Sequence, residues 1–522
     1  AMDFRELLSR QVVLIDGAMG TQVQALGMTD EDFGGGEFRM LTDLLTFAHP
    51  GAVRDIHLAY YRAGANCVET NTFGASPFRL AEYDFSRLDL TAFEPLPDGL
   101  DPRTMGRDDL AYHLSRRGAE TACEAREAYR KDSGYDGRPL FVIGSIGPSN
   151  RVLSSTDADL VVSTFDDMVE NFRVQVRGLI AGGADVLLFE TQQDILETKA
   201  GVFGARKAMA EAGVDLPIMC QVTVDAFSKM QIFNTDIHAA QVTVEGIGIT
   251  TFGINCSIGP DLMEKTVKRM AERCPLPISV LPNAGLPVSE AGQTVFRFPP
   301  DQFAEYLTRY VEEYGVNVVG GCCGTTPDHI AALREAVGDR APAERTVKRR
   351  TYLSGPQEAV EVDSSESLIR IGERLNVRGS EKVRNAVESD GGIDHDALDE
   401  VVHGQVHELG LTIIDVCMDS NLVDTTKALC EVVHRQTTDF KGAMCLDSFD
   451  VEALEEAIKV YPGRPIVNSF SMEEVAPGVT QEMWLFDDQY PGPVLRGQVG
   501  DIFTVTLVNE GEIGHSIDFH AS

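Results

Sequence analysis

The sequence predicts an α/β protein whose first 340 residues form a (β/α)8 TIM barrel. Short runs of apolar, mostly β-branched residues recur in this region, and a helical stretch follows each run. Strands that are apolar along their whole length are buried on both faces, as in a parallel sheet covered by helices. About eight such runs match the repeat of this barrel. They lie at residues 12–16, 65–70, 140–144, 184–190, 216–222, 251–256, 277–281 and 316–319.

Length and composition bound the class of protein. A chain of 522 residues can hold two or more domains with large cores. The formal net charge of −36 argues against binding to nucleic acids or anionic membranes. No apolar run reaches the length of a membrane span, and the first residues do not resemble an export signal. Ten cysteines are too sparse for a disulfide scaffold, so we expect reduced thiols in a cytoplasmic protein.

In barrels of this class the chemistry lies at the carboxyl ends of the strands. Polar residues close almost every predicted strand, so their side chains would face one common opening. They are Asp16, Glu69, Asn71, Ser145, Glu190, Thr191, Thr223, Asp225, Asn255, Cys256, Asn283, Cys322 and Cys323.

Three of these residues are cysteines, and they predict a metal site. Cys322 and Cys323 follow the eighth strand between glycines, and Cys256 ends the sixth. Only one strand separates these two in a closed ring, so the three sulfurs can reach one ion. Three protein ligands with a fourth position left for substrate are typical of catalytic zinc. The alternatives are core cysteines, half of a disulfide framework, or a structural zinc closed by Cys220.

Six short motifs occupy these strand ends. They are Asp16-Gly-Ala-Met-Gly-Thr21, Glu69-Thr-Asn-Thr-Phe-Gly74, Gly147-Pro148, Glu190-Thr191, Asn255-Cys256 and Gly320-Gly-Cys-Cys-Gly-Thr325. Together they resemble the homocysteine S-methyltransferase barrel, over residues 5–338. The resemblance implies that Cys256, Cys322 and Cys323 bind Zn²⁺, with the homocysteine sulfur as fourth ligand. It implies contacts to the amino-acid end of homocysteine from Asp16, Gly17, Ala18, Met19, Gly20, Glu190 and Asn255.

The chemistry of such a site agrees with methyl transfer. A free thiol has a pKa of about 8.5, and the thiolate is the nucleophile. Coordination to Zn²⁺ deprotonates a thiol, and three thiolate ligands leave a bound homocysteine sulfur electron-rich. That sulfur can attack a methyl group on a good leaving group. No catalytic general base is therefore expected among the residues of the chain.

Residues 341–364 are expected to be a linker, after which the alternation of strands and helices resumes. The expected strands are 368–371, 411–415, 443–447 and 465–468, and the expected helices include 396–409 and 451–460. Four strands make half a barrel, so residues 365–476 are predicted to form a partial second (β/α) barrel. Its open edges would leave backbone groups unpaired, and we expect an incomplete folate site.

Three motifs mark the strand ends of this second region. They are Gly372-Glu-Arg-Leu-Asn-Val-Arg-Gly-Ser380, Asp447-Ser448 and Val467-Asn-Ser-Phe-Ser471. They resemble the pterin-binding domain of cobalamin-dependent methionine synthases. The resemblance implies that methyltetrahydrofolate is bound through Asn376, Asp415, Asp447 and Asn468. One residue departs from the family pattern, since Cys417 stands where Asn is usual.

Residues 477–522 change to a period of two, which predicts a short antiparallel β tail. The segments Pro491-Gly-Pro-Val-Leu-Arg496 and His515-Ser-Ile-Asp-Phe-His520 resemble the opening strands of a cupredoxin domain of multicopper-oxidase type. A blue-copper site needs a later Cys, His and usually Met. None of these follows in the sequence. We therefore expect a cupredoxin-like fragment in which His515 and His520 do not form a copper site.

These observations predict zinc-dependent methyl transfer to homocysteine, giving methionine, as the substrate module of a cobalamin- and folate-dependent methionine synthase. Methylcobalamin would be the methyl donor, recharged from 5-methyltetrahydrofolate. No Asp-x-His-x-x-Gly cobalamin motif occurs, so cobalamin is expected to be supplied in trans. Two alternatives stay open. One is a different donor, betaine or S-methylmethionine, and the other is a non-catalytic binding module with structural zinc.

Overall fold

A computed structural model describes residues 2–468 apart from 97–98, 158, 291–292, 349, 364–368 and 390. The described residues belong to one compact unit, Ala1–Ser469. The predicted cupredoxin-like tail lies outside the described residues. In the part of the chain that is described, no helix combines the length and apolar character needed to cross a membrane.

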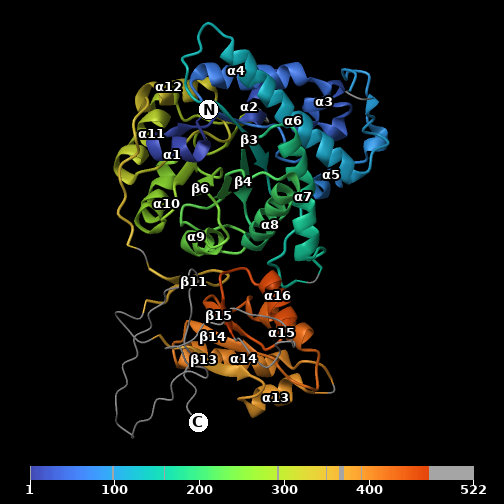
Figure 1. Ribbon diagram of the computed structural model, residues 1–522, viewed down its shortest axis with the longest axis vertical. Coiled ribbons are helices and arrows are strands. Elements are labelled where there is room, and N and C mark those ends of the chain that lie inside the picture. Colours follow the sequence, from blue (N-terminus) through green and yellow to red (C-terminus); the bar gives the residue numbers. More distant parts are fainter. Residues whose placement is uncertain are drawn as a thin grey trace. The chain divides into compact units, whose positions relative to one another are not determined.

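The first part of the chain is an eight-stranded parallel sheet curved into a barrel, which confirms the predicted fold class (Figure 1). An isolated parallel bridge between Ile15 and Cys67 joins the first and last strands of the sheet. Because all strands run parallel, their carboxyl ends meet at one mouth. In spatial order they are β1 (Val13–Leu14), β10 (Val318–Val319), β7 (Ile278–Leu281), β6 (Thr251–Asn255), β5 (Ile218–Val222), β4 (Val186–Gln192), β3 (Phe141–Ile146) and β2 (Cys67–Glu69).

Helices cover the outside of this barrel (Figure 1). The longer ones are α4 (Pro50–Ala63), α6 (Arg107–Arg130), α7 (Phe165–Ala181), α8 (Ile195–Ala212), α9 (Ile237–Glu245), α10 (Pro260–Arg273), α11 (Pro300–Tyr314) and α12 (Pro327–Val337). The segments that follow β1 and β2 contain α2 (Met19–Ala25), η1 (Glu31–Phe33), η2 (Gly36–Phe38), η3 (Thr42–Leu44), α3 (Leu45–Ala48), α5 (Pro77–Leu80) and η4 (Phe85–Arg87). A hairpin, β8 (Val288–Glu290) and β9 (Gln293–Val295), follows β7.

The amino-terminal helix α1 (Phe4–Arg10) packs against the strands of the barrel. Phe4, Leu7 and Leu8 are buried in one cluster with apolar residues of the strands, among them Val13 and Ile143. Burying side chains of this size stabilises the fold by about 1.5–3 kcal/mol each. The apolar face of α1 is therefore part of the barrel core.

Residues 372–468 contain a second parallel sheet of four described strands, as expected for a partial barrel. Its strands are β13 (Gly372–Asn376), β14 (Ile413–Cys417), β15 (Ala443–Asp447) and β16 (Ile466–Asn468). Its helices are α13 (Glu381–Val387), α14 (His395–His403), the π-helix η6 (Gly404–Glu408), α15 (Thr425–Gln436) and α16 (Val451–Val460). One buried apolar cluster joins the strands to these helices.

Two details of this region differ from the expectation. The predicted strand at 368–371 is wrong, because β13 begins at Gly372 and pairs there with Ile414 of β14. Ile371 is 41% exposed, so the apolar run does not mark the buried strand. In the expected linker, β11 (Tyr352–Ser354) and β12 (Ala359–Glu361) form an antiparallel hairpin.

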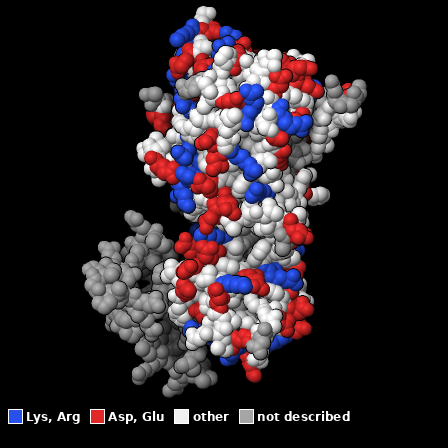
Figure 2. Space-filling model, turned by 90° about the vertical axis from the view of Figure 1, so that its right-hand side faces the viewer, with Lys and Arg blue, Asp and Glu red and all other residues white. Residues whose placement is uncertain are grey.

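Acidic and basic side chains are interspersed on the face drawn in Figure 2. Many such pairs are one helical turn apart, as with Arg116 and Glu120 on α6, whose charged atoms are 2.8 Å apart. Pairs at this spacing stabilise a helix by about 0.2–0.5 kcal/mol each.

Two glycines let α6 and α7 approach closely. A Cβ atom on Gly178 would lie 2.3 Å from the carbonyl oxygen of Tyr112, and one on Gly182 would lie 2.3 Å from that of Arg116. Contacts this short are impossible, so any larger residue forces the two helices apart. These glycines therefore determine how closely α7, which precedes β4, sits against α6.

We expect Gly178→Ala to lower the free energy of unfolding by about 1–3 kcal/mol, the usual effect of overpacking. Urea unfolding measures this change. Gly51→Ala on α4 is the matched control, since a Cβ atom there meets nothing within 4 Å. Alanine favours a helix over glycine by about 1 kcal/mol, so the control should be neutral or stabilising. Equal stability of both variants would contradict the close-packing explanation.

Candidate metal and substrate site

The first element of the site is the end of β6. Cys256 directly follows this strand and has a left-handed backbone with φ 63°, and Ser257 continues it with φ 66°. Ile258 N–H donates to the Cys256 carbonyl oxygen over 2.8 Å, which closes a tight turn. Left-handed backbone at non-glycine residues is costly and is concentrated at functional sites. The turn keeps the Cys256 side chain at the mouth of the barrel.

The second element is the glycine-rich loop after β10. A Cβ atom on Gly320 would lie 2.8 Å from the Ile15 carbonyl oxygen, so only glycine fits there. Cys322 N–H donates to the Pro282 carbonyl oxygen over 2.9 Å, which ties the loop to the end of β7. The Cys323 carbonyl oxygen accepts a bond of 2.9 Å from Ala284 N–H. Backbone bonds on both cysteines therefore hold the pair in place.

The structure brings Cys256, Cys322 and Cys323 together. Their sulfur atoms all lie within 4.8 Å of one another, and those of Cys256 and Cys323 are 3.9 Å apart. Tetrahedral ligands about 2.3 Å from zinc lie about 3.8 Å apart, so this spacing suits one ion. Within the described residues, no other group of three His, Cys, Asp or Glu side chains is so arranged. All ten cysteines are free thiols, and Cys220 is buried outside this group.

Hydrogen bonds within the group shift the pKa values of the three thiols in opposite directions. The hydrogen bonds with Cys322 and Cys323 lower the pKa of the Cys256 thiol. The bonds to Cys256 in turn raise the pKa of both Cys322 and Cys323. These bonds therefore make Cys256 the most readily ionised of the three thiols. A divalent ion would displace the remaining protons, because metal binding requires deprotonated cysteines.

Three carboxyl groups, those of Asp16, Glu69 and Glu190, share the same mouth. Burial raises the pKa of Glu190 to about 7 and raises the pKa values of Asp16 and Glu69 well above their usual range. The carboxylates also repel one another, which raises the pKa values of Asp16 and Glu69 further. Glu69 N–H donates to Asp16 Oδ2 over 3.0 Å. Asp16 Oδ1 and Glu69 Oε1 are buried without a hydrogen-bond partner among the described residues.

Asn255 links the carboxyl groups to the cysteines. Its Nδ2 group lies 3.3 Å from Glu190 Oε2, 2.9 Å from Thr191 Oγ1 and 3.9 Å from Cys322 Sγ. Its Oδ1 atom accepts a bond of 2.8 Å from Thr191 N–H. The Ser145 hydroxyl donates to the other oxygen of Glu190. Asn255 thus holds the Glu190 carboxyl group beside the sulfur cluster.

The turn from Asp16 to Gly20 lies against the cysteine loop. Ala18 N–H donates over 3.2 Å to the hydroxyl of Thr325, which itself donates over 2.6 Å to the Cys322 carbonyl oxygen. A Cβ atom on Gly17 would lie 2.5 Å from that hydroxyl oxygen, so a larger residue does not fit. Met19 and Gly20 begin α2, and a Cβ atom on Gly20 would meet nothing within 4 Å.

Several residues of the site were not among the predicted binding residues. Glu69 was recognised only as a polar strand end, although its position beside Asp16 gives it a distinct charge environment. Thr325 and Tyr60 were missed. The Tyr60 hydroxyl lies 3.3 Å from the Ala18 carbonyl oxygen and 3.2 Å from that of Thr325. Tyr60 lies on α4, and no strand-end pattern could have identified it.

The predicted folate residues lie at the carboxyl ends of the second sheet. Asn376, Cys417, Asp447 and Asn468 are successive cross-strand partners, so they form one row over four strands. Asp415 is buried two residues before Cys417 on β14. Asn376 Oδ1 accepts the N–H groups of Arg378 and Gly379 at 2.9 and 3.0 Å, so it also shapes the following loop.

Asp419, four residues after Asp415, was not among the predicted folate residues. It is buried, and its carboxylate accepts the Ser448 hydroxyl over 2.6 Å and Phe449 N–H over 3.0 Å. These bonds join the loops after β14 and β15 next to the row of polar residues.

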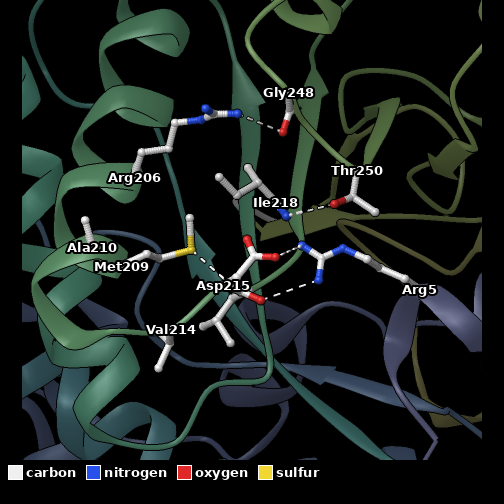
Figure 3. A pocket seen from close by; sticks show the side chains of 10 residues that line it. Arg5, Arg206, Met209, Ala210, Val214, Asp215, Ile218, Gly248 and Thr250 are labelled. Atoms are coloured by element: carbon white, nitrogen blue, oxygen red, sulfur yellow. Dashed lines mark hydrogen bonds and ion pairs between the residues drawn. The ribbon is translucent and has the colours of Figure 1, made fainter.

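A cavity of about 280 Å³ lies away from this mouth, beside the starts of β5 and β6 (Figure 3). Arg5 reaches Asp215 there, with 3.2 Å between the charged atoms, and Arg206 donates over 3.2 Å to the Gly248 carbonyl oxygen. Both guanidinium groups therefore have partners within the chain. The cavity contains no cysteine or histidine and is not the candidate site.

Comparison with known proteins agrees with the geometry of the first barrel. A family model described as homocysteine S-methyltransferase matches residues 13–337. The chain belongs to this family. As a member of it, the protein is a methyltransferase. A second family model, described as pterin binding enzyme, matches residues 372–485.

The methionine synthases of Mycobacterium tuberculosis and Mycobacterium leprae are each 32% identical to this methyltransferase, over 474 and 482 residues. The matches cover 90% of this chain and 36% of each relative, so the chain spans about a third of their length. Two solved structures of the homocysteine methyltransferase MmuM from Escherichia coli, oxidised and metallated, have TM-scores of 0.47 at 24% and 25% identity. They cover 62% of this chain and 95% and 96% of MmuM.

We expect Thr325→Val to lower the free energy of unfolding by about 1–3 kcal/mol, because Ala18 N–H then loses its buried acceptor. Equilibrium unfolding in urea measures the change. Thr325→Ser is the matched control, since it retains the hydroxyl that joins the two loops. If Val and Ser at this position gave the same stability, the hydroxyl bridge would not be the stabilising interaction.

Proposed function

We propose that this methyltransferase transfers a methyl group to the thiol of homocysteine in a zinc-dependent reaction that gives methionine. The observation that carries the proposal is the convergence of the sulfurs of Cys256, Cys322 and Cys323 at the barrel mouth. The donor set fits Zn²⁺, because thiolates are preferred zinc ligands and three of them leave a fourth position for substrate. All three cysteines are only half-buried.

The three cysteines would hold the ion, and the ion would supply the chemistry of a stabilised thiolate at neutral pH. The residues of the chain position the acceptor. Backbone bonds to Pro282 and Ala284 hold the cysteine loop, and Asn255 holds Glu190 beside it. Since the acceptor thiol is ionised on binding, none of the carboxyl groups is needed as a base.

The carboxyl groups suit the amino-acid end of homocysteine. Asp16 and Glu69 each present a buried oxygen without a partner in the described part of the chain, and Glu190 lies close enough to raise their pKa values. Burial of three carboxylates without a cation is unfavourable. An α-ammonium group supplies that cation and three hydrogen-bond donors. We propose that Asp16, Glu69 and Glu190 bind the ammonium group, with Asn255 and the turn of Gly17, Ala18, Met19 and Gly20 completing the pocket.

We propose that the chain is the substrate module of a cobalamin- and folate-dependent methionine synthase. The match of residues 372–485 to pterin binding enzymes supports a folate-fed donor over betaine or S-methylmethionine. Asn376, Asp415, Asp447 and Asn468 would bind the pterin of 5-methyltetrahydrofolate at the ends of the second sheet. Cys417 stands in the middle of that row and offers a thiol in place of an amide. Methylcobalamin would be supplied in trans.

Methyl transfer from free methylcobalamin to homocysteine tests the proposal directly. We expect the zinc-loaded protein to form methionine and Cys322→Ala to lose activity by roughly a hundredfold or more, since altering the surroundings of a zinc ion already costs 10–100-fold. Bound zinc is measured in the same samples. Cys123→Ala is the matched control, because Cys123 lies on α6 outside the sulfur cluster.

The outcomes separate the alternatives. Zinc retained by Cys322→Ala would indicate another metal site. Zinc bound by the parent without any turnover would favour a structural ion in a binding module. Activity with betaine or S-methylmethionine, but none with methylcobalamin, would replace the proposed donor.

A second test concerns the ammonium group. We expect Glu69→Gln to lower kcat/KM for homocysteine about ten- to a hundredfold, the usual effect of losing a hydrogen bond to a charged group. The same variant should leave transfer to 4-sulfanylbutanoate, which lacks the ammonium group, unchanged. Glu82→Gln, a change outside the site, is the control. An equal loss with both thiols would show that Glu69 does not recognise the ammonium group.

A further inference from the structure

An irregular turn interrupts the helix that precedes β14. The α-helix α14 ends at His403 and continues as a π-helix over Gly404–Glu408. Leu409 N–H donates to the Gly404 carbonyl oxygen, five residues back, over 3.3 Å. Single π turns within helices are rare and are frequently found at functional sites.

Gln405 explains why the helix widens here. Its side chain is 3% exposed, and its Oε1 atom accepts Arg374 N–H of β13 over 2.9 Å. A Cβ atom on Gly372 would lie 2.5 Å from the same oxygen, so the strand is shaped to receive this amide. The anchored glutamine fixes the side of the π turn that faces β13. The solvent-facing side of the turn, which we call its outer side, is therefore held in one conformation.

Two histidines occupy that outer side. His403 and His407 are both exposed, and their ring centroids are 4.4 Å apart with 39° between the ring planes. Among the described residues, neither imidazole takes part in a hydrogen bond or an ion pair. By contrast, His395 at the start of α14 lies 2.8 Å from a carboxylate oxygen of Glu431. The pair is therefore held close together and has free ring nitrogens.

We propose that His403 and His407 form a second metal site, which takes a divalent transition ion such as Ni²⁺, Cu²⁺ or Zn²⁺. Two histidines four residues apart on one helix face can ligate one ion, and imidazole suits these three metals. Water would complete the coordination. Exposed Glu408, which follows His407 in the sequence, adds negative charge that favours a cation. The π turn pre-organises the pair, which lowers the entropy lost when both rings bind.

This site differs in chemistry from the sulfur cluster, and it does not depend on the proposed methyl transfer. Its ligands are neutral nitrogens, whereas the cluster offers thiolates, which select zinc. An ion bound by both His403 and His407 would also link the end of α14 to the π turn. Because it binds the folded state, it would stabilise this part of the chain.

Nickel titration of the full chain tests the proposal, after the cysteine site has been filled with one equivalent of zinc. Calorimetry should show one further equivalent of bound Ni²⁺. We expect His403→Ala and His407→Ala each to weaken that binding at least about tenfold, as loss of one of two chelating ligands removes the chelate. His395→Ala on the same helix is the matched control and should bind as the parent does.

Diethyl pyrocarbonate labelling provides a second measurement on the unaltered protein. Bound Ni²⁺ should protect His403 and His407 from modification and leave His113 of α6 unaffected, as read by mass spectrometry. The proposal is overturned if no further equivalent binds, if both alanine variants bind Ni²⁺ as tightly as the parent, or if the two histidines are modified equally with and without the metal.

Discussion

Three cysteine sulfurs within 4.8 Å of one another cannot all be ionised unless a cation lies among them, and the barrel mouth is built around this constraint. Holding the three sulfurs this close requires strained backbone at some residues and close packing at others. Cys256 and Ser257 adopt left-handed conformations, and Gly320 allows the cysteine loop to approach the end of β1. A cluster held this rigidly by the backbone needs little reorganisation to bind an ion.

The same electrostatic principle operates beside the sulfurs. Asp16, Glu69 and Glu190 are buried near one another, and burial raises the pKa of each. In the proposed reaction, the soft thiolates would bind the metal ion, and the hard carboxylate oxygens would bind the ammonium group of the substrate. Asn255 contacts both groups and keeps them in a fixed relation. A substrate with a thiol at one end and an ammonium group at the other would satisfy both groups.

The second sheet follows the geometry of the first with different side chains. Parallel pairing aligns Asn376, Cys417, Asp447 and Asn468 across four strands, since each is the register partner of the next. Asp419 joins two of the loops that follow. Before β14 begins, the π turn of η6 holds two imidazoles close together, and Gln405 anchors that turn to β13. Both arrangements arise from backbone register.

The sequence alone determined the barrel, its strand ends and the candidate cysteines, because periodicity and strand-end polarity are local properties that a parallel sheet gathers at one mouth. Only the tertiary structure placed Tyr60 and Thr325 against the Asp16 turn and set the sulfur spacing, because those contacts join residues more than 40 positions apart. The structure also starts the strand at Gly372 and not in the apolar run predicted at 368–371, and it contains the unpredicted hairpin near Tyr352. Pairing partners decide a strand's register, and no local pattern specifies them.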